Sequence, residues 1–352
     1  MSPAMPSLAG LSPVTLDASA GPKEGRVRNR GLTLLLLASL TGATSPAHAV
    51  CPSFAGPFEV ARVETDELDE ASGLVASRRH PGIFWTHNDS GDGPRVFAID
   101  RQGRLRGLFE LADTKAIDWE DLAIGPGPEP GRNYLYLADV GDNPLERARV
   151  LVHRIAEPEL PPAAAADKTQ IIETMDTFIL EQPRGPQDTE AIVVDPVSGD
   201  LLLLTKEDWG CEPVPGPNCG RGWILRAPAL AREPTGRVVE LEVEGRFEVA
   251  PEASRYGRLT SAADSSEDGH WILIRTYLRA GLWERRGDES LSKTLARRPC
   301  SVPVAGWPEE KQGEAIAFAP NGQRYWTISE GEHPMLFEYV RTPLAVPSAS
   351  TR

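Results

Sequence analysis

A short strand-like signature recurs five times along this chain and constrains the fold more than any other feature. Each copy has a Ser or Glu, then a small or polar residue, then a mostly apolar run. The copies are EASGLVAS at Glu70–Ser77, DWEDLAIG at Asp118–Gly125, DTEAIVVD at Asp188–Asp195, LTSAADSS at Leu259–Ser266 and QGEAIAFA at Gln312–Ala319. A turn and a second, more aromatic strand follow each copy. Related units at intervals of about fifty to seventy residues are typical of a radial repeat. The sequence therefore predicts an all-β fold, a five-bladed β-propeller.

One strand precedes the first signature and has no blade of its own. Phe58–Val63 (FEVARV) alternates apolar and polar residues with the period of a strand, and the last repeat supplies only three strands. We therefore expect this segment to be the outer strand of the last blade, where it joins the two chain ends and removes a free edge. A six-bladed propeller is the alternative architecture, but it would need a sixth signature.

The outer strands of the other blades are assigned from alternating patterns between Gly-rich and Pro-rich turns. The pattern predicts the outer strand of the second blade within Gln170–Leu180, that of the third at Val238–Val249 and that of the fourth at Ser290–Ala296. No segment predicts a long helix.

Residues 1–49 have the pattern of a signal peptide with an N-terminal extension. Basic residues within Gly21–Gly31 precede the apolar run Leu32–Leu40, and Ala47-His48-Ala49 fits a cleavage site. That run is shorter than the ~20 residues of a transmembrane helix; a retained membrane anchor is the alternative. We expect residues 50–342 to form one propeller domain, residues 343–352 to be a disordered tail, and the mature protein to be secreted or periplasmic.

All four cysteines follow the predicted cleavage site, and an even number in an oxidising compartment favours disulfides. Cys211 and Cys219 bracket a short loop, so we expect them to pair locally. Cys51 and Cys300 would then close a long loop and tie the start of the domain near its last blade. Free thiols are the alternative, and the spacings match no zinc site.

The chain has 51 acidic residues against 37 Lys and Arg, a net charge of −14. Nucleic acids and anionic membranes need a basic face, so the charge argues against both as partners. An acidic balance fits a protein that binds cations, and we expect a monomer.

If the first strand of each blade is innermost, the signature residues point toward the central channel. They form a predicted ring of Ser72, Glu120, Glu190, Ser261 and Glu314. Neighbouring carboxylates repel by about 4 kcal/mol per pair at ~4 Å and an effective dielectric of ~20, so protons or a cation must offset the repulsion. Oxygen ligands without His or Cys suit Ca²⁺ better than zinc. The ring therefore predicts a calcium-type site; the alternative is a water-filled channel with partly protonated glutamates.

Antiparallel pairing places the end of each second strand beside the start of each first strand, which predicts one polar face rich in carboxylates. On this face Asp118 and Asp188 are candidates to activate water beside the cation. Lys206 and Arg275 are candidates to hold an anionic ligand. Each of these two cations would alternatively pair with a neighbouring acid.

Two polar loops supply further ligand-binding candidates, Asn88 and Asp139. The loop at Asn88–Gly93 (NDSGDG) resembles a calcium loop, but an EF-hand would need a Glu where Ile99 stands. Asx turns explain both loops equally well.

The order Ser, Glu, Glu, Ser, Glu around five blades resembles the central calcium site of the calcium-activated nucleotidase (apyrase) family, in which each blade contributes one such residue. The resemblance covers only these short motifs and implies a calcium role for the five ring residues. Segments such as DWEDLAIG, LADVGDN and DTEAIVVDP also look like a group of secreted bacterial propeller proteins without an assigned activity. This second resemblance spans most of the mature chain and implies no chemistry.

Two classes of function remain open from the sequence. In the first, the protein is a Ca²⁺-dependent hydrolase of phosphate-containing or other small anionic substrates, with its acidic face binding the substrate. In the second, calcium only stabilises a binding or scaffold propeller that performs no reaction. A structural metal has all its ligands from protein, whereas a catalytic metal keeps an open position, and a sequence does not distinguish the two.

Overall fold

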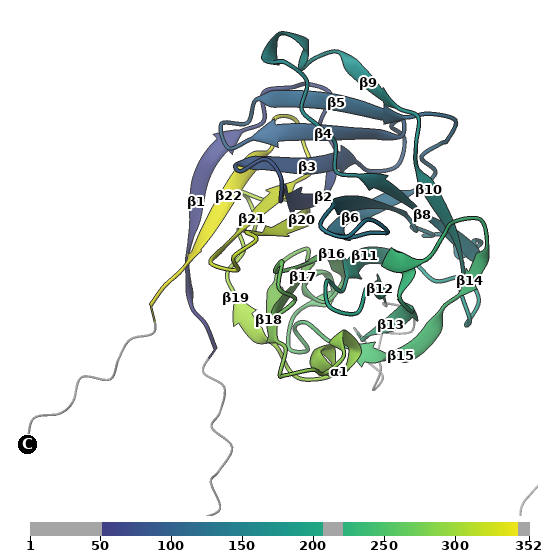
Figure 1. Ribbon diagram of the computed structural model, residues 1–352. Helices are drawn as coiled ribbons and strands as arrows, with labels where there is room; N and C mark the ends of the chain where they lie inside the picture. The colour runs from purple at the N-terminus through teal and green to yellow at the C-terminus, as the bar shows by residue number, and fades with distance from the viewer. Residues whose placement is uncertain (1–50, 207–220, 344–352) are drawn as a thin grey trace, which may run out of the picture. The chain divides into compact units, whose positions relative to one another are not determined.

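The computed structural model of this chain describes residues 51–206 and 221–343. Five small sheets of four or five strands are arranged in a ring (Figure 1). The first strand of each repeat is innermost, and each inner strand contacts the inner strands of the two neighbouring blades. The described residues therefore form a five-bladed β-propeller, as the repeated signature predicts, and not the six-bladed alternative.

The strands follow one another outward in each blade, and two sheets gain a further strand from a later part of the chain. The first sheet contains β2 (Ala71–Ala76), β3 (Ile83–Asn88), β4 (Arg95–Asp100), β5 (Leu105–Leu111) and β9 (Thr169–Ile172). The second contains β6 (Trp119–Pro126), β7 (Asn133–Asp139), β8 (Arg149–Ala156), β10 (Asp176–Glu181) and β14 (Val238–Glu240). The third contains β11 (Thr189–Val194), β12 (Leu201–Thr205), β13 (Gly222–Ala227) and β15 (Glu242–Phe247).

The last two sheets have four strands each. The fourth contains β16 (Thr260–Ser265), β17 (Trp271–Thr276), β18 (Ala280–Glu284) and β19 (Cys300–Val302). The fifth contains β20 (Gly313–Phe318), β21 (Arg324–Ser329), β22 (Met335–Arg341) and β1 (Phe54–Arg62). Helical structure in the described residues is limited to α1 (Leu291–Leu295) and the 3₁₀ turns η1 (Ala163–Ala165), η2 (Leu230–Arg232) and η3 (Arg255–Gly257).

The apolar cores lie between adjacent blades. Phe84 of β3 packs edge-to-face against Trp326 of β21, with ring centroids 4.9 Å apart, and one buried cluster contains both residues. Because such packing buries both faces of the inner strands, every residue of β2, β11, β16 and β20 is buried. The candidate site lies at the starts of these inner strands.

The prediction of an outer strand at Ser290–Ala296 is wrong. This segment forms α1, because the Ser290 side chain caps its start by accepting a hydrogen bond from the Lys293 amide. Leu291 and Leu295 lie one helical turn apart and are both buried in the core between the third and fourth blades. The outer strand of the fourth blade is β19, which pairs with β18.

Two predicted single strands are each divided between neighbouring blades. The segment within Gln170–Leu180 becomes β9, which pairs in parallel with β5 of the first blade, and β10 of the second blade. The segment Val238–Val249 likewise becomes β14, paired in parallel with β10, and β15 of the third blade. In both cases the connection to the next outer strand covers an edge that would otherwise be unpaired.

The N-terminal strand closes the ring, as predicted. β1 pairs with β22 in antiparallel fashion, from Phe54 opposite Arg341 to Arg62 opposite Met335. The predicted Cys51–Cys300 disulfide is present, with a Cα–Cα distance of 5.4 Å, and it ties the segment before β1 to β19 of the fourth blade.

Several sequence predictions lie outside the described residues. They are the signal peptide at 1–49, the Cys211–Cys219 disulfide and all but the first residue of the tail at 343–352. Within the described ranges, no helix has the length and apolar character needed to cross a membrane.

Candidate functional site

The starts of the five inner strands share one local irregularity. In each blade the pairing between the inner and second strands shifts register at the signature residue or directly after it. A β-bulge at this place interrupts the alternation of side chains between the two faces of the sheet. One side chain therefore points in a different direction from the one that regular alternation would give it. The five signature residues are Ser72, Glu120, Glu190, Ser261 and Glu314, and all are buried at this end of the inner strands.

The second strands end beside these bulges, as the antiparallel arrangement predicts. The amide of Asp89, directly after β3, donates to the Glu70 carbonyl at 2.9 Å. In the third blade the Lys206 amide donates to the Asp188 carbonyl at 2.8 Å. Residues that follow a second strand are therefore brought next to the residues that begin an inner strand.

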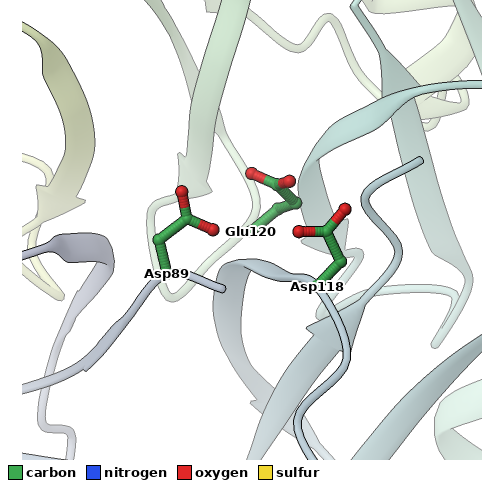
Figure 2. A group of neighbouring side chains, drawn as sticks. All are labelled: Asp89, Asp118 and Glu120. Carbon is green, nitrogen blue, oxygen red and sulfur yellow. The ribbon is translucent and has the colours of Figure 1, made fainter. Parts of the chain in front are cut away.

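This arrangement assembles an acidic cluster, defined here as Asp89, Asp118, Glu120, Asp188 and Glu190. One carboxylate oxygen each of Asp89, Asp118 and Glu120 lie within 4.8 Å of one another, and the same holds for Glu120, Asp188 and Glu190. Figure 2 shows the first three carboxylates converging from two neighbouring blades. Glu120 belongs to both groups and links them.

Burial and mutual repulsion raise the pKa values of these acids. Burial, followed by the charge of Asp89, raises the pKa of Asp118 to about 6. Burial raises the pKa of Glu190 to about 7, although Lys206 opposes this. The pKa of Glu120 lies well above its usual range because of burial and the nearby charge of Glu190. The protein thus crowds carboxylates without enough positive charge to keep them all ionised.

Lys206 is the predicted anion-binding cation that does reach the cluster. Its Nζ lies 2.7 Å from Oε1 of Glu190 and 5.1 Å from the centre of the Tyr277 ring. Both partners of the Lys206–Glu190 pair are largely buried. Lys206 therefore pairs with a neighbouring acid, which is the alternative that the sequence left open.

Arg275, the second predicted anion-binding residue, is buried inside the fold, whereas the prediction placed it on the polar face. Its side chain is fully buried and pairs with the equally buried Glu310 at 2.5 Å. It also donates to the Ala315 carbonyl, beneath the start of β20. With no exposed surface, its guanidinium cannot contact a ligand.

Asn88 and Asp139, the two loop candidates, are used inside the fold. Asn88 donates its amide to the Glu67 carbonyl and to Asp92, and its Oδ1 accepts from the Glu70 amide. Asp139 has no exposed side-chain surface and pairs with Arg147 at 2.7 Å. These bonds give Asn88 and Asp139 structural roles inside the fold.

The two serines of the predicted ring connect neighbouring blades. The Ser72 hydroxyl donates to the Glu120 carbonyl at 2.5 Å, and the Ser261 hydroxyl donates to the Gly313 carbonyl at 2.7 Å. Glu314, in turn, has a pKa raised to about 8 by burial and by the charge of Glu190. The ring is therefore asymmetric, because its carboxylates come from the second, third and fifth blades and its hydroxyls from the first and fourth.

Asp89 was not among the sequence-predicted site residues. The signals for it were its place after the second strand, on the predicted acidic face, and its place in the NDSGDG loop. Asp118 and Asp188, predicted to activate water, belong to the two groups of converging carboxylates. Their role as proton acceptors stays a prediction.

The donor atoms of the cluster are of a kind that could hold a cation. A Cβ on Gly141 would lie 2.2 Å from Oε1 of Glu120 and 2.5 Å from Oδ2 of Asp118, so only glycine leaves room for both carboxylates there. The converging side-chain donors are all carboxylate oxygens. Hard oxygen donors of this kind match Ca²⁺ and Mg²⁺ rather than zinc.

A pocket of about 400 Å³ lies on the Tyr277 side of Lys206. Its lining residues are Tyr256, Tyr277, Leu278, Trp307, Lys311 and Gln312. Trp307 is 72% exposed, which is unusual for so large an apolar side chain. The loop carrying Trp307 is held on either side, because the Ala305 amide donates to the Tyr339 hydroxyl and Glu310 pairs with Arg275.

Comparisons with known proteins support the fold alone. No family model matches the chain, and no curated protein matches it. Among solved structures it is similar to Raptor of Chaetomium thermophilum, at 10% identity and a TM-score of 0.41, over 84% of this chain and 30% of that one. It is also similar to the Cps50 (Swd1) β-propeller domain of Myceliophteria thermophila, at 11% identity and a TM-score of 0.39, over 81% of this chain and 99% of that domain.

A third similar structure is a chain of the mitotic checkpoint complex, at 11% identity and a TM-score of 0.32, over 76% of this chain and 60% of that one. Likenesses this distant carry no argument about activity or partners.

Proposed function

We propose that the acidic cluster binds a calcium ion, with Asp89, Asp118 and Glu120 as its side-chain ligands. The observation that carries the proposal is that these three carboxylates converge within 4.8 Å while none forms an ion pair with another described residue. A bound cation would supply the missing positive charge. Water can complete the six to eight oxygen ligands that calcium usually takes.

The ion would join two blades, since Asp89 follows β3 of the first blade and the other two ligands lie at the start of β6. Asp89 and Asp118 are only partly buried, which leaves the outer side of the group accessible to solvent. This accessibility, together with the aromatic pocket beside Lys206, favours a face that binds a small ligand. We propose a ligand that carries an anionic group.

Hydrolysis of a small phosphate-containing substrate is the second candidate function, and the same accessibility favours it. A calcium ion bound there would polarise an oxygen of the substrate. Asp118 is better placed than Asp188 to accept a proton from water, because Asp188 is buried and bonded to the Asp142 amide. The alternative is that calcium only stabilises a binding or scaffold propeller.

We also propose that the mature protein is exported to an oxidising compartment and acts there as a monomer. The Cys51–Cys300 disulfide supports export, because disulfides persist mainly in secreted and periplasmic proteins.

The test is a calcium titration of three proteins, the natural chain, Gly141→Ala and Gly306→Ala. Neither glycine has a positive φ, so alanine is compatible with both backbones. A methyl group at position 141 would push the Glu120 and Asp118 carboxylates apart, whereas nothing lies within 4 Å of a Cβ at position 306. We expect calcium to raise the melting temperature of the natural chain and of Gly306→Ala. Calorimetry should show at least a tenfold loss of affinity in Gly141→Ala.

A natural chain whose melting temperature and calorimetric signal are unaffected by millimolar calcium would refute the cation site. Hydrolysis of a nucleoside diphosphate and of p-nitrophenyl phosphate is measured in the same samples. Turnover that appears with calcium and is lost in Gly141→Ala supports the enzyme. Calcium binding without turnover supports the binding propeller.

A further inference from the structure

The aromatic pocket beside Lys206 combines ring faces that are open to solvent with polar groups at its rim. Its volume of about 400 Å³ is at the lower end of the range of roughly 300–1,000 Å³ for small-molecule sites, so it suits a ring-sized group. Its lining residues come from η3, from the turn after β17 and from the loop between β19 and β20. None of them belongs to the acidic cluster. The pocket is therefore a site distinct from the cation site.

Two aromatic rings of the pocket are exposed although the backbone around them is anchored. Trp307 is 72% exposed and Tyr256 is 59% exposed. The Ala305 amide, two residues before Trp307, donates to the Tyr339 hydroxyl at 2.5 Å, and the buried Glu310 lies three residues after Trp307. Exposed apolar side chains that gather at one place mark interaction sites more often than single scattered ones do.

Tyr277 forms the inner wall of the pocket. Its ring centre lies 6.4 Å from that of Tyr256, and the two ring planes are 56° apart. Behind it, Nζ of Lys206 lies 5.1 Å from the centre of the Tyr277 ring. The two tyrosine rings thus meet at a corner and do not form a parallel slot for a flat aromatic ligand.

The rim of the pocket offers both hydrogen-bond donors and acceptors. Lys311 is exposed, and its ammonium group makes no ion pair with another described residue. Gln312 donates its side-chain amide to Oε1 of Glu330 at 2.8 Å, which leaves its carbonyl oxygen as an acceptor. The tyrosine hydroxyls can donate and accept. Of the six lining residues only Leu278 is aliphatic, so the ligand must satisfy polar groups as well as ring faces.

The charges around the pocket favour an uncharged group. Lys311 is the only charged residue of the lining, and its ammonium would repel a cation. The carboxylate of Glu330 lies beside Gln312 at the same rim and would repel an anion. Neither sign of charge therefore finds a surrounding of purely opposite charge.

We propose that this pocket binds a neutral sugar ring, packed on Trp307 and Tyr256 and hydrogen-bonded by Lys311 and Gln312. The C–H groups on the face of a pyranose are apolar and fit the electron-rich face of an aromatic ring. Its hydroxyls lie around the edge, and each can donate and accept as the rim requires. This goes beyond the proposed cation site, and a sugar ring is compatible with the anionic ligand proposed above as its uncharged part.

The experiment follows the indole N–H signals of the eight tryptophans by NMR during titration with methyl glucoside, methyl galactoside and methyl mannoside. The signal missing from Trp307→Ala identifies Trp307. We expect at least one glycoside to shift that signal with a Kd of about 1–10 mM. The titration is performed in EDTA, so its result does not depend on whether the acidic cluster binds calcium.

The variants Trp307→Ala and Trp307→Phe separate binding from a structural role. By calorimetry, the affinity for the glycoside should fall at least tenfold in Trp307→Ala and less in Trp307→Phe, which keeps an aromatic face. The melting temperature of both should stay that of the natural chain, since Trp307 is mostly exposed. Phe58→Ala is the matched control, because Phe58 is 49% exposed in β1 and lies outside the pocket. Its glycoside affinity should stay within about twofold of the natural chain.

Four outcomes would overturn the proposal. If none of the three glycosides shifts the Trp307 signal at 50 mM, the site does not bind a sugar. Tighter binding of benzamide than of every glycoside would identify the ligand as a flat aromatic group instead. Tighter binding of glucuronate than of the neutral glycosides would overturn the inference of an uncharged group. Glycoside binding that requires calcium would place the ligand at the acidic cluster and not in this pocket.

Discussion

The first and third blades place oppositely charged residues at the same position of the fold. Asp89 follows the second strand of the first blade, and its amide bonds to the Glu70 carbonyl. Lys206 follows the second strand of the third blade, and its amide bonds to the Asp188 carbonyl. The backbone hydrogen bond is equivalent in the two blades. The signature residue differs, Ser72 in the first blade and Glu190 in the third, and so does the side chain directly after the second strand.

That side chain decides how the neighbouring carboxylates are neutralised. Lys206 gives Glu190 a partner at 2.7 Å, and this side of the cluster contains its own cation. Asp89 instead adds a third carboxylate to Asp118 and Glu120, and this side requires a cation from solution. A repeat fold can therefore build a permanent ion pair and a cation site from the same position in different blades.

The largest expected effect comes from removing the internal cation with Lys206→Met. Breaking a buried ion pair by deleting one partner costs about 3–5 kcal/mol, because the other charge stays buried. We expect a loss of about 3 kcal/mol in the free energy of unfolding at pH 8, measured with urea in the presence of EDTA. The loss should shrink toward pH 6, where Glu190, with its pKa of about 7, takes up a proton instead.

Lys311→Met is the control for this change, since Lys311 is exposed and makes no ion pair with a described residue. Its effect should stay within about 0.5 kcal/mol, as for most surface substitutions. Equal stability of Lys206→Met and the natural chain at pH 8 would contradict the internal-cation interpretation.

The reverse change, Asp89→Lys, should place a cation directly after the second strand of the first blade, where the third blade has Lys206. The new ammonium group would neutralise Asp118 and Glu120 as Lys206 neutralises Glu190, and a calcium ligand would be lost. We expect the calcium-dependent rise in melting temperature to disappear. The free energy that calcium adds at a hundred times its Kd, about 2.7 kcal/mol, would be lost with it.

Asp288→Lys changes the net charge by the same amount at an exposed position far along the chain, in the segment before α1. This control should keep the calcium response of the natural chain. A response that survives in Asp89→Lys would show that the cation lies elsewhere, for example between Glu120, Asp188 and Glu190.

The sequence predicted the elements that depend on local pattern. The bulged starts of the inner strands carry their own signature, so Glu120 and Glu190 could be placed together from spacing alone. The closing strand and the Cys51–Cys300 disulfide followed from the unpaired strand and the even number of cysteines. Each of these inferences needs only the repeat and ordinary strand geometry.

What the sequence did not predict depends on where loops lie in three dimensions. Glu310 lies between β19 and β20 in a loop without a pattern, so its buried pair with Arg275 could not be foreseen. The division of two outer strands between blades arises because their neighbours' edges need partners. Asp121 was read only as a polar residue of the signature, yet it accepts amides of both Ile192 and Ala263 and so links three blades.

A slope of stability with pH sharpens the comparison without any mutation. The folded-state pKa values are about 6 for Asp118, about 7 for Glu190 and about 8 for Glu314, against 3.8 for an ordinary Asp and 4.5 for an ordinary Glu. Between the unfolded and folded values, the folded state binds more protons. The free energy of unfolding must therefore fall as pH rises from about 4.5 to about 8, by up to about 1.4 kcal/mol per pH unit for each proton.

Calcium should remove the part of this slope that comes from its proposed ligands Asp118 and Glu120, because a bound cation favours the ionised carboxylates and lowers their pKa values in the folded state. The measurement is the melting temperature between pH 5 and pH 8, once in EDTA and once in excess calcium. Asp264, whose pKa of about 7 reflects burial at a place bonded to the Phe318 amide, titrates in both series and cancels in their difference. The difference between the two curves should widen with pH, since only the acidic cluster responds to calcium. If the melting-temperature curves in EDTA and in calcium are parallel, protons alone neutralise the crowded carboxylates, and neither side of the cluster binds a metal.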